Sequence, residues 1–250
     1  MVKLFIPLAI VCALSVVPGF AQSWPENKSS DRFDTGKGYL EIAFLGHGSL
    51  VLFYNGSYIY VDPVSQYANF SKYPKADLIL VTHEHGDHLD AKAIAMLGKD
   101  STRIILPEAS RQKLGKGEAL GHNQAVEAAG VRVMAVPAYN VTPGRTAYHP
   151  KDRKDNGYIV TAGSGSDALH IYIAGDTEPI PEMAALGPVD IAFLPMNQPY
   201  TMTPEQAASA ARTIHPKILY PYHFGSTDTA VLQKLLAANP EIEVRIRKLQ

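Results

Sequence analysis

Histidines and carboxylates are concentrated in one short stretch, Thr82-His83-Glu84-His85-Gly86-Asp87-His88-Leu89-Asp90. In an extended segment, His83 and His85 point to the same side. Imidazole nitrogens are ligands for borderline metals such as zinc, and Asp87 adds an anionic oxygen. His88 follows Asp87 directly, so a turning backbone directs this pair at a second ion. Two ions about 3.5–4 Å apart can share a bridging hydroxide. The stretch therefore predicts a metal centre, because desolvating so many ionisable groups without a partner is costly.

The elements on either side of this stretch define where it lies. Residues 76–81 form a short, continuous apolar run rich in branched side chains, which predicts a buried strand. After the stretch, Ala91, Ile94 and Leu97 follow helical spacing, and Gly98 is a helix stop. We therefore expect the histidines on a strand-to-helix turn, where a rigid scaffold commonly presents functional side chains.

The pattern His-x-His-x-Asp-His at residues 83–88 resembles the signature of the metallo-β-lactamase fold superfamily. The resemblance extends from about residue 40 to the C-terminus. It implies an α/β fold, an αββα four-layer sandwich that carries a one- or two-metal site along its edge.

Composition sets limits on the class of protein. The chain has 250 residues, a formal net charge of −1 and 46% hydrophobic content. These values suit one globular domain, or two fused half-units that share one core. A near-neutral balance gives no electrostatic reason to expect nucleic acid as a partner.

The first residues have the features of a secretory signal peptide. Lys3 gives a positive start, residues 4–17 are apolar, and Gly19 and Ala21 are the small residues before a cut at position 21. The apolar run is too short for a comfortable membrane span, although an uncleaved anchor is the alternative. Cys12, the single cysteine, lies inside this segment, so residues 22–250 contain neither disulfides nor thiolate ligands. We predict a signal peptide at 1–21, a flexible leader at 22–38, a hydrolase domain at 39–250, and a secreted or periplasmic location.

Two hairpin patterns, each ending near an aspartate, indicate an internal two-fold repeat. Residues 50–54 and 57–61 flank Asn55-Gly56, a strong hairpin signal, and Asp62 follows. Residues 157–161 and 168–173 flank a second turn, and Asp176 comes shortly after. Each half is therefore expected to contribute to one central site.

The resemblance assigns further metal ligands. It matches Asp176 to the carboxylate that bridges two metals, and His223 to the ligand that completes the second metal with Asp87 and His88. Members usually carry a third histidine after the strand predicted at 131–136, where this chain has Asn140. An amide oxygen is a poor substitute for imidazole on zinc. His149, on the following loop, is therefore the other candidate, and both residues remain possible ligands of metal or substrate.

Residues near the ligands give three further expectations. His47 and Asp62 lie at strand ends close to the metals, and Asp62 is expected to orient a metal-bound histidine. The loop at residues 140–156 is long enough to be a binding loop or lid. Its four basic residues favour an anionic substrate, with a solvated face as the alternative: Arg145, Lys151, Arg153 and Lys154. Asn197 and Tyr200 follow a predicted strand and either line the pocket or serve packing.

These observations favour an exported metal-dependent hydrolase of a small molecule. Two Zn²⁺ ions are expected, with Mn²⁺ or Fe²⁺ as alternatives. A metal-bound hydroxide would attack an ester, lactone or phosphodiester, and Asp87 would orient the water or accept its proton. The alternatives are an iron-dependent oxidoreductase of the same fold and a non-catalytic protein whose first metal site is degenerate at Asn140. Glutamate in place of His85 is typical of the di-iron reductases, and many β-lactamases carry a cysteine near Asp176. The sequence leaves the substrate, the metal and the oligomeric state open.

Overall fold

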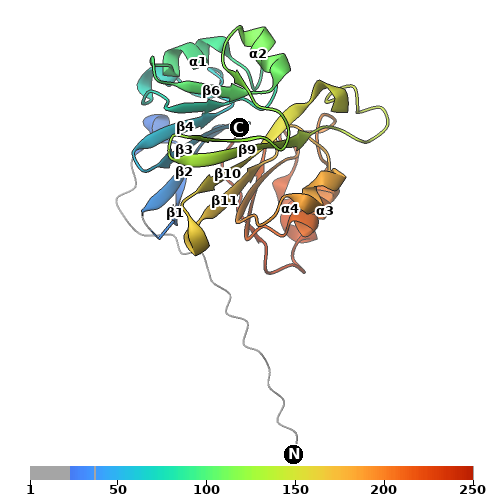
Figure 1. Ribbon diagram of the computed structural model, residues 1–250. Helices are drawn as coiled ribbons and strands as arrows, with labels where there is room; N and C mark the ends of the chain where they lie inside the picture. Colours follow the sequence, from blue (N-terminus) through green and yellow to red (C-terminus); the bar gives the residue numbers. More distant parts are fainter. Residues whose placement is uncertain (1–22, 37, 250) are drawn as a thin grey trace, which may run out of the picture.

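Two seven-stranded β-sheets stack face to face, and helices cover their outer surfaces (Figure 1). The computed structural model describes residues 23–36 and 38–249, so the predicted signal peptide at 1–21 lies outside the described residues. None of the described helices has the length and apolar character needed to cross a membrane. This architecture is the αββα sandwich expected from the sequence.

The two sheets have the same internal plan. The first contains β1 (Ser30–Asp34), β2 (Tyr39–Gly46), β3 (Ser49–Tyr54), β4 (Ser57–Val61), β5 (Leu78–Leu80), β6 (Arg103–Leu106) and β7 (Glu118–Ala119). The second contains β8 (Ala125–Ala128), β9 (Val131–Ala138), β10 (Asp155–Ala162), β11 (Leu169–Ile173), β12 (Ile191–Pro195), β13 (Ile218–Tyr222) and β14 (Glu243–Val244). In each sheet the strands follow chain order, with three antiparallel pairings and then three parallel ones. This agrees with the predicted two-fold repeat.

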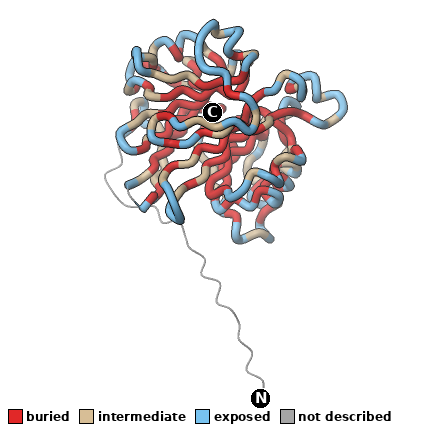
Figure 2. Tube along the Cα trace, viewed as in Figure 1, coloured by how far each residue is buried: buried red, intermediate tan, exposed pale blue. Residues whose placement is uncertain are grey.

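Alternating side chains on the strands separate the inner core from the outer one. On β2, Leu40, Ile42 and Phe44 belong to the large core shared with the second sheet, whereas Ala43 and Leu45 belong to a separate cluster on the opposite face. That separate cluster also contains Ile94 and Leu97 of α1. The period of two along a strand produces this division. Figure 2 shows the buried segments concentrated in the two sheets. The core therefore fixes the strand ends from which the site residues project.

Within the described part of the chain, four α-helices pack outside the sheets. They are α1 (Ala91–Leu97), α2 (Glu108–Leu114), α3 (Pro204–Ile214) and α4 (Thr229–Leu235). The first two lie on the side of the first sheet, and α3 and α4 lie together beside the second (Figure 1). Asp90 caps α1 by accepting from the backbone of Lys92 and Ala93, and Thr203 and Gln206 form a capping box at the start of α3, whose Thr-x-x-Gln spacing is visible in the sequence.

The segment before β2 is not the flexible leader that the sequence suggested. Residues 30–34 form β1, which pairs antiparallel with β2, so that prediction is wrong for this stretch. The buried carboxylate of Glu41 explains the order. It accepts hydrogen bonds from Trp24 Nε1 at 2.8 Å, Ser30 Oγ at 2.7 Å and Arg32 Nη2 at 2.9 Å. Because these donors compensate a buried charge, the ordered domain begins before residue 39.

Candidate metal centre

The predicted ligands gather at one edge of the sandwich, where several strands end. His83, His85, Asp87 and His88 follow β5, Asp176 follows β11 and His223 follows β13. The carboxyl ends of parallel strands are the usual location of sites in open α/β sheets. The turn between β2 and β3 adds His47, and the loop between β9 and β10 adds His149. Both halves of the chain therefore contribute to one site, as predicted.

The first group of ligand atoms consists of three imidazoles. One nitrogen each from His83, His85 and His149 lies within 4.8 Å of the others. His83 Nε2 and His85 Nδ1 are 3.1 Å apart, and His149 Nε2 is 3.3 Å from Asp176 Oδ2. Three imidazoles that converge in this way form a donor set that suits zinc.

The second group combines histidines with Asp87. Ligand atoms of His47, Asp87, His88 and His223 lie within 4.8 Å of one another. Asp87 Oδ2 is 3.1 Å from His47 Nε2, 3.6 Å from His223 Nε2 and 3.9 Å from His88 Nε2. His47 was expected beside the ligands, and the structure places its ring nitrogen among them.

Asp176 lies between the two groups. Its Oδ1 is 3.5 Å from His88 Nε2, and its Oδ2 is 3.3 Å from both His149 Nε2 and His223 Nε2. Gly175 precedes it with φ +66°, and a Cβ there would lie 2.7 Å from the carbonyl oxygen of Asn156. Only glycine fits this close approach, and the resulting turn directs the aspartate into the centre.

Buried polar atoms without partners show that this donor set fits metal ions. His88 Nε2, His223 Nε2 and Asp176 Oδ1 have no hydrogen-bond partner among the described residues, although all three residues are buried. Leaving such atoms unpaired costs about 1–3 kcal/mol each. Their convergence on one volume is what coordination of cations would satisfy.

The electrostatics of the site keep several imidazoles neutral. Burial lowers the pKa of His83 well below its ordinary value, and burial also lowers the pKa values of His47 and His85. For His88, burial acts in the same direction, but the carboxylates of Asp176 and Asp62 outweigh it and raise its pKa to about 9. The nearby rings of His223 and His47 outweigh the effect of burial on Asp87 and lower its pKa. A neutral imidazole and an ionised carboxylate are the forms that bind metals.

Asp62 orients the His88 ring, as the sequence suggested. Its Oδ2 is 2.8 Å from His88 Nδ1 and accepts from Thr82 Oγ1 at 2.7 Å, while its Oδ1 accepts from the Thr82 backbone at 2.7 Å. A hydrogen bond at Nδ1 leaves Nε2 free to face the site. Asp62 is itself held in the left-handed region, with φ +43°, as are His47 at +53° and His223 at +45°. Such backbone costs about 1–3 kcal/mol per residue and clusters at functional sites.

Asn140 has a different environment from His149. Its side-chain Nδ2 donates to the carbonyl oxygens of Tyr200 at 2.7 Å and Arg145 at 3.2 Å. It does not line the pocket that contains the ligands, whereas His149 does. Of the two candidates, the structure therefore brings His149 into the ligand group.

The basic side chains of the loop at residues 140–156 are largely paired within the protein. Arg145 Nη1 is 2.6 Å from the buried carboxylate of Glu178, and Lys151 Nζ is 3.2 Å from Glu182. Arg153 binds Asp155 and Glu84. This pairing removes most of the positive potential on which the expectation of an anionic substrate rested.

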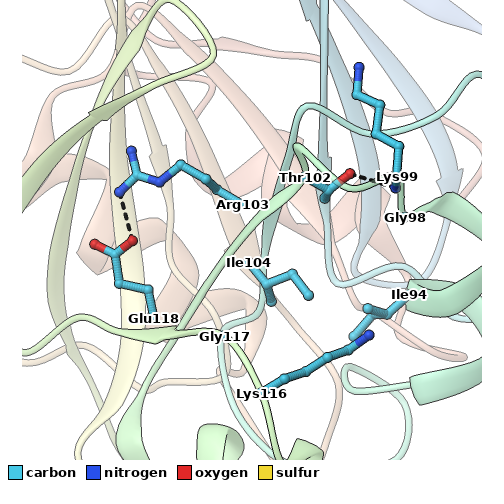
Figure 3. Close-up of a pocket in the computed structure, with 9 residues that line it drawn as sticks. All are labelled: Ile94, Gly98, Lys99, Thr102, Arg103, Ile104, Lys116, Gly117 and Glu118. Atoms are coloured by element: carbon cyan, nitrogen blue, oxygen red, sulfur yellow. Dashed lines mark hydrogen bonds and ion pairs between the residues drawn. The ribbon is translucent and has the colours of Figure 1, made fainter.

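One pocket opens onto the ligands and a second hollow lies elsewhere. The first, about 360 Å³, is lined by His85, Asp87, His149, Asp176 and His223 together with Tyr148, Asn197 and Tyr200. Figure 3 shows another hollow, beside α1 and β6, where Arg103 pairs with Glu118 at 2.7 Å. None of the predicted site residues lines that second hollow.

Stacked sheets with a histidine and carboxylate cluster at one edge define a metal enzyme of the metallo-β-lactamase fold. Residues 41–223 match the family model described as β-lactamase superfamily domain. The chain belongs to this superfamily, and within it to the UPF0173 metal-dependent hydrolases.

Relatives and solved structures support this placement. The UPF0173 metal-dependent hydrolase of Thermococcus kodakarensis is 32% identical over 206 residues, which cover 75% of this chain and 85% of the relative. The relative from Pyrococcus horikoshii is 31% identical over 225 residues, covering 82% and 96%. The crystal structure of a candidate metal-dependent hydrolase from Parabacteroides distasonis has a TM-score of 0.85 and 54% identity, and covers 89% of this chain and all of that one.

Proposed function

We propose that this metal-dependent hydrolase is an exported enzyme that holds two zinc ions and cleaves an ester, lactone or phosphodiester. The observation that carries the proposal is the position of Asp176 between the two groups. Its carboxylate oxygens lie close to His149 Nε2 of the first group and to His88 Nε2 and His223 Nε2 of the second. His83, His85 and His149 would hold one ion. Asp87, His88 and His223 would hold the other, and Asp176 would lie between both.

Bound zinc would lower the pKa of a coordinated water and polarise the oxygen of the scissile group. The chain itself supplies a proton acceptor. Asp87 Oδ2 lies 3.1 Å from His47 Nε2, which positions it. From there it can orient the attacking water and take its proton at Oδ2. His47 holds that oxygen in place, and Asp62 fixes the ring of His88.

The alternatives have less support. The non-catalytic alternative rested on a first site that is degenerate at Asn140, but His149 brings a third imidazole to that group. An iron-dependent oxidoreductase of the same fold was disfavoured because His85 stands where glutamate is typical. His85 Nδ1 lies 3.1 Å from His83 Nε2, which keeps the first group all-nitrogen. Such a set suits zinc, although imidazole also binds iron.

Metal content and hydrolysis test the proposal together. Elemental analysis of the purified protein is expected to give two zinc ions per chain. Zinc-loaded protein should hydrolyse dihydrocoumarin, 4-nitrophenyl acetate or bis(4-nitrophenyl) phosphate. Asp87→Asn should reduce kcat by about 10²–10⁴ because it removes the proton acceptor, and its zinc content is measured alongside because Asp87 is also a proposed ligand of the second ion. Asp100→Asn, which makes the same carboxylate-to-amide change at an exposed residue, is a matched control. Two zinc ions without turnover of any of the three would refute the hydrolase, and oxygen-dependent chemistry with iron would favour the oxidoreductase.

Export has its own test. Cleavage after Ala21 would leave Gln22 as the first residue, which mass spectrometry of protein from the periplasm or the culture medium would identify. Full-length protein in the membrane fraction would favour the uncleaved anchor instead.

A further inference from the structure

Exposed aromatic side chains meet at the mouth of the metal pocket. Among the described residues, the exposed large hydrophobics are Val141, Tyr148 and Tyr200, at 44%, 37% and 45% exposure. Tyr148 and Tyr200 both line the pocket, and their rings lie edge to face with centroids 5.0 Å apart. Single exposed apolar residues need no explanation, but a group at the entrance of a site is typical of ligand recognition.

Two loops present these rings, and hydrogen bonds fasten the loops together. Tyr148 is in the loop between β9 and β10, and Tyr200 is in the loop between β12 and α3. Asn140 joins them by donating to the carbonyl oxygens of Arg145 and Tyr200. Arg145 adds bonds to Gln198, to the carbonyl oxygen of Thr201 and to Glu178. Because the loops are already fixed, little ordering entropy opposes binding between them and the ligands.

The same network decides what the pocket can recognise. Three of the four cations of the β9–β10 loop that were expected to attract an anion, Arg145, Lys151 and Arg153, are engaged with Glu178, Glu182 and Asp155. The pocket-lining residues outside the ligand groups are Tyr148, Asn197 and Tyr200, none of which carries a positive charge. Neither tyrosine hydroxyl has a hydrogen-bond partner among the described residues. Ring faces and edges are therefore the main recognition surface beside the metals.

We propose that the Tyr148–Tyr200 pair binds an aromatic ring of the substrate, next to the bond that is hydrolysed. This inference rests on the proposed hydrolase function and narrows it to substrates that carry a flat aromatic group. Aromatic rings prefer the offset or edge-to-face arrangements that an open pair of tyrosines offers.

The test compares two ketones that share a bicyclic skeleton. In 2-tetralone one ring is aromatic, and in 2-decalone both rings are saturated, so general hydrophobicity is nearly matched. Neither contains a hydrolysable bond, and 2-tetralone is the carbocyclic analogue of dihydrocoumarin. Dissociation constants from calorimetric titration of the zinc-loaded protein are expected to favour 2-tetralone by about three- to tenfold.

Substitutions at the two tyrosines test whether they cause the preference for 2-tetralone. Tyr148→Ala and Tyr200→Ala are each expected to reduce it to less than twofold, whereas Tyr148→Phe and Tyr200→Phe should keep it because they keep the rings. Tyr39→Ala, at the opposite end of β2 from His47, is the remote control. Equal binding of the two ketones by the wild-type protein, or a preference that survives both alanine variants, would overturn the inference. Dimerisation through the two tyrosines without ketone preference would also overturn it.

These experiments distinguish a failure of the aromatic-site proposal from a failure of the hydrolase proposal. A tyrosine-dependent preference for 2-tetralone without hydrolysis of dihydrocoumarin or the other esters would remove the hydrolase proposal and keep the aromatic site. Hydrolysis of dihydrocoumarin and δ-valerolactone with equal kcat/KM, together with equal ketone binding, would keep the hydrolase and remove the aromatic site.

Discussion

Replacing His149 and Asn140 separately distinguishes the two residues that the sequence left as candidates for the first metal. His149→Ala removes one of three imidazoles that lie within 4.8 Å of one another. Asn140→Ala instead removes two hydrogen bonds to carbonyl oxygens at 2.7 and 3.2 Å. The first change should therefore affect metal binding, and the second should affect stability.

The magnitudes follow from these contacts. Loss of a residue that merely orients a ligand weakens metal binding by about 10–100-fold. Loss of His149 itself should reach at least the upper end, about 100-fold or 2.7 kcal/mol. For Asn140→Ala, two net hydrogen bonds of about 0.5–1.5 kcal/mol each predict a loss of about 1–3 kcal/mol in the free energy of unfolding. In a chain of this size that corresponds to a Tm lower by about 2–12 °C.

Elemental analysis after dialysis against a zinc buffer gives the zinc content per chain. Competition with a chromophoric chelator gives the affinities. Calorimetry gives Tm. His215→Asn is a suitable control because His215 is an exposed helix cap with φ +52°, a conformation that asparagine tolerates. The reasoning is refuted if Asn140→Ala loses one ion while His149→Ala keeps two.

Three more measurements address the surroundings of the site. Asp62→Asn should weaken zinc binding by about 10–100-fold because His88 loses its orienting carboxylate, and unchanged affinity in the chelator assay would contradict this role. Burial opposes ionisation of Glu178, but bonds from Thr142, Val141 and Arg145 lower its pKa below 4.5. Its stabilising effect is therefore present above about pH 4.5 and lost as the pH falls. The free energy of unfolding of Glu178→Gln, measured by denaturation at several pH values, should decrease less on the acid side than that of the wild type. Glu41→Ala should release Trp24, the single tryptophan, and shift its fluorescence emission maximum to the red. An unshifted maximum would argue against Glu41 as the anchor of this segment.

Local spacing explains why much of the site was predictable. The cluster at residues 83–88 is set by one strand and the turn that follows it, so its geometry depends on few distant contacts. The hairpin turn at Asn55-Gly56 and the capping box at Thr203 are local as well, and the structure has both. The strand ends before Asp176 and His223 were recognisable from apolar runs, which places both residues at the same edge once the sheets form.

Long-range pairing explains what the sequence did not show. His47 reaches the ligand group because its carbonyl oxygen accepts from the His223 backbone at 3.1 Å, a contact between the two halves. The flanking Gly46 and Gly48 were the only local signal, and a Cβ at Gly48 would lie 3.0 Å from the His88 ring. The pairing of Arg145 with Glu178 and the anchoring of β1 by Glu41 join residues far apart in the chain, so charge counts alone were misleading there.

The repeated strand plan of the two sheets has a consequence for how this enzyme can diverge. His47 and His149 occupy equivalent connections, after β2 in one half and after β9 in the other. The first connection is a tight turn, whereas the second is an excursion from residue 139 to residue 154 that carries Tyr148. Insertions or exchanges in the longer connection can therefore alter which molecules enter while the opposite half keeps its share of the ligands in place. The duplication therefore leaves the entrance to the site on a long connection of one half, apart from the ligands that the other half contributes.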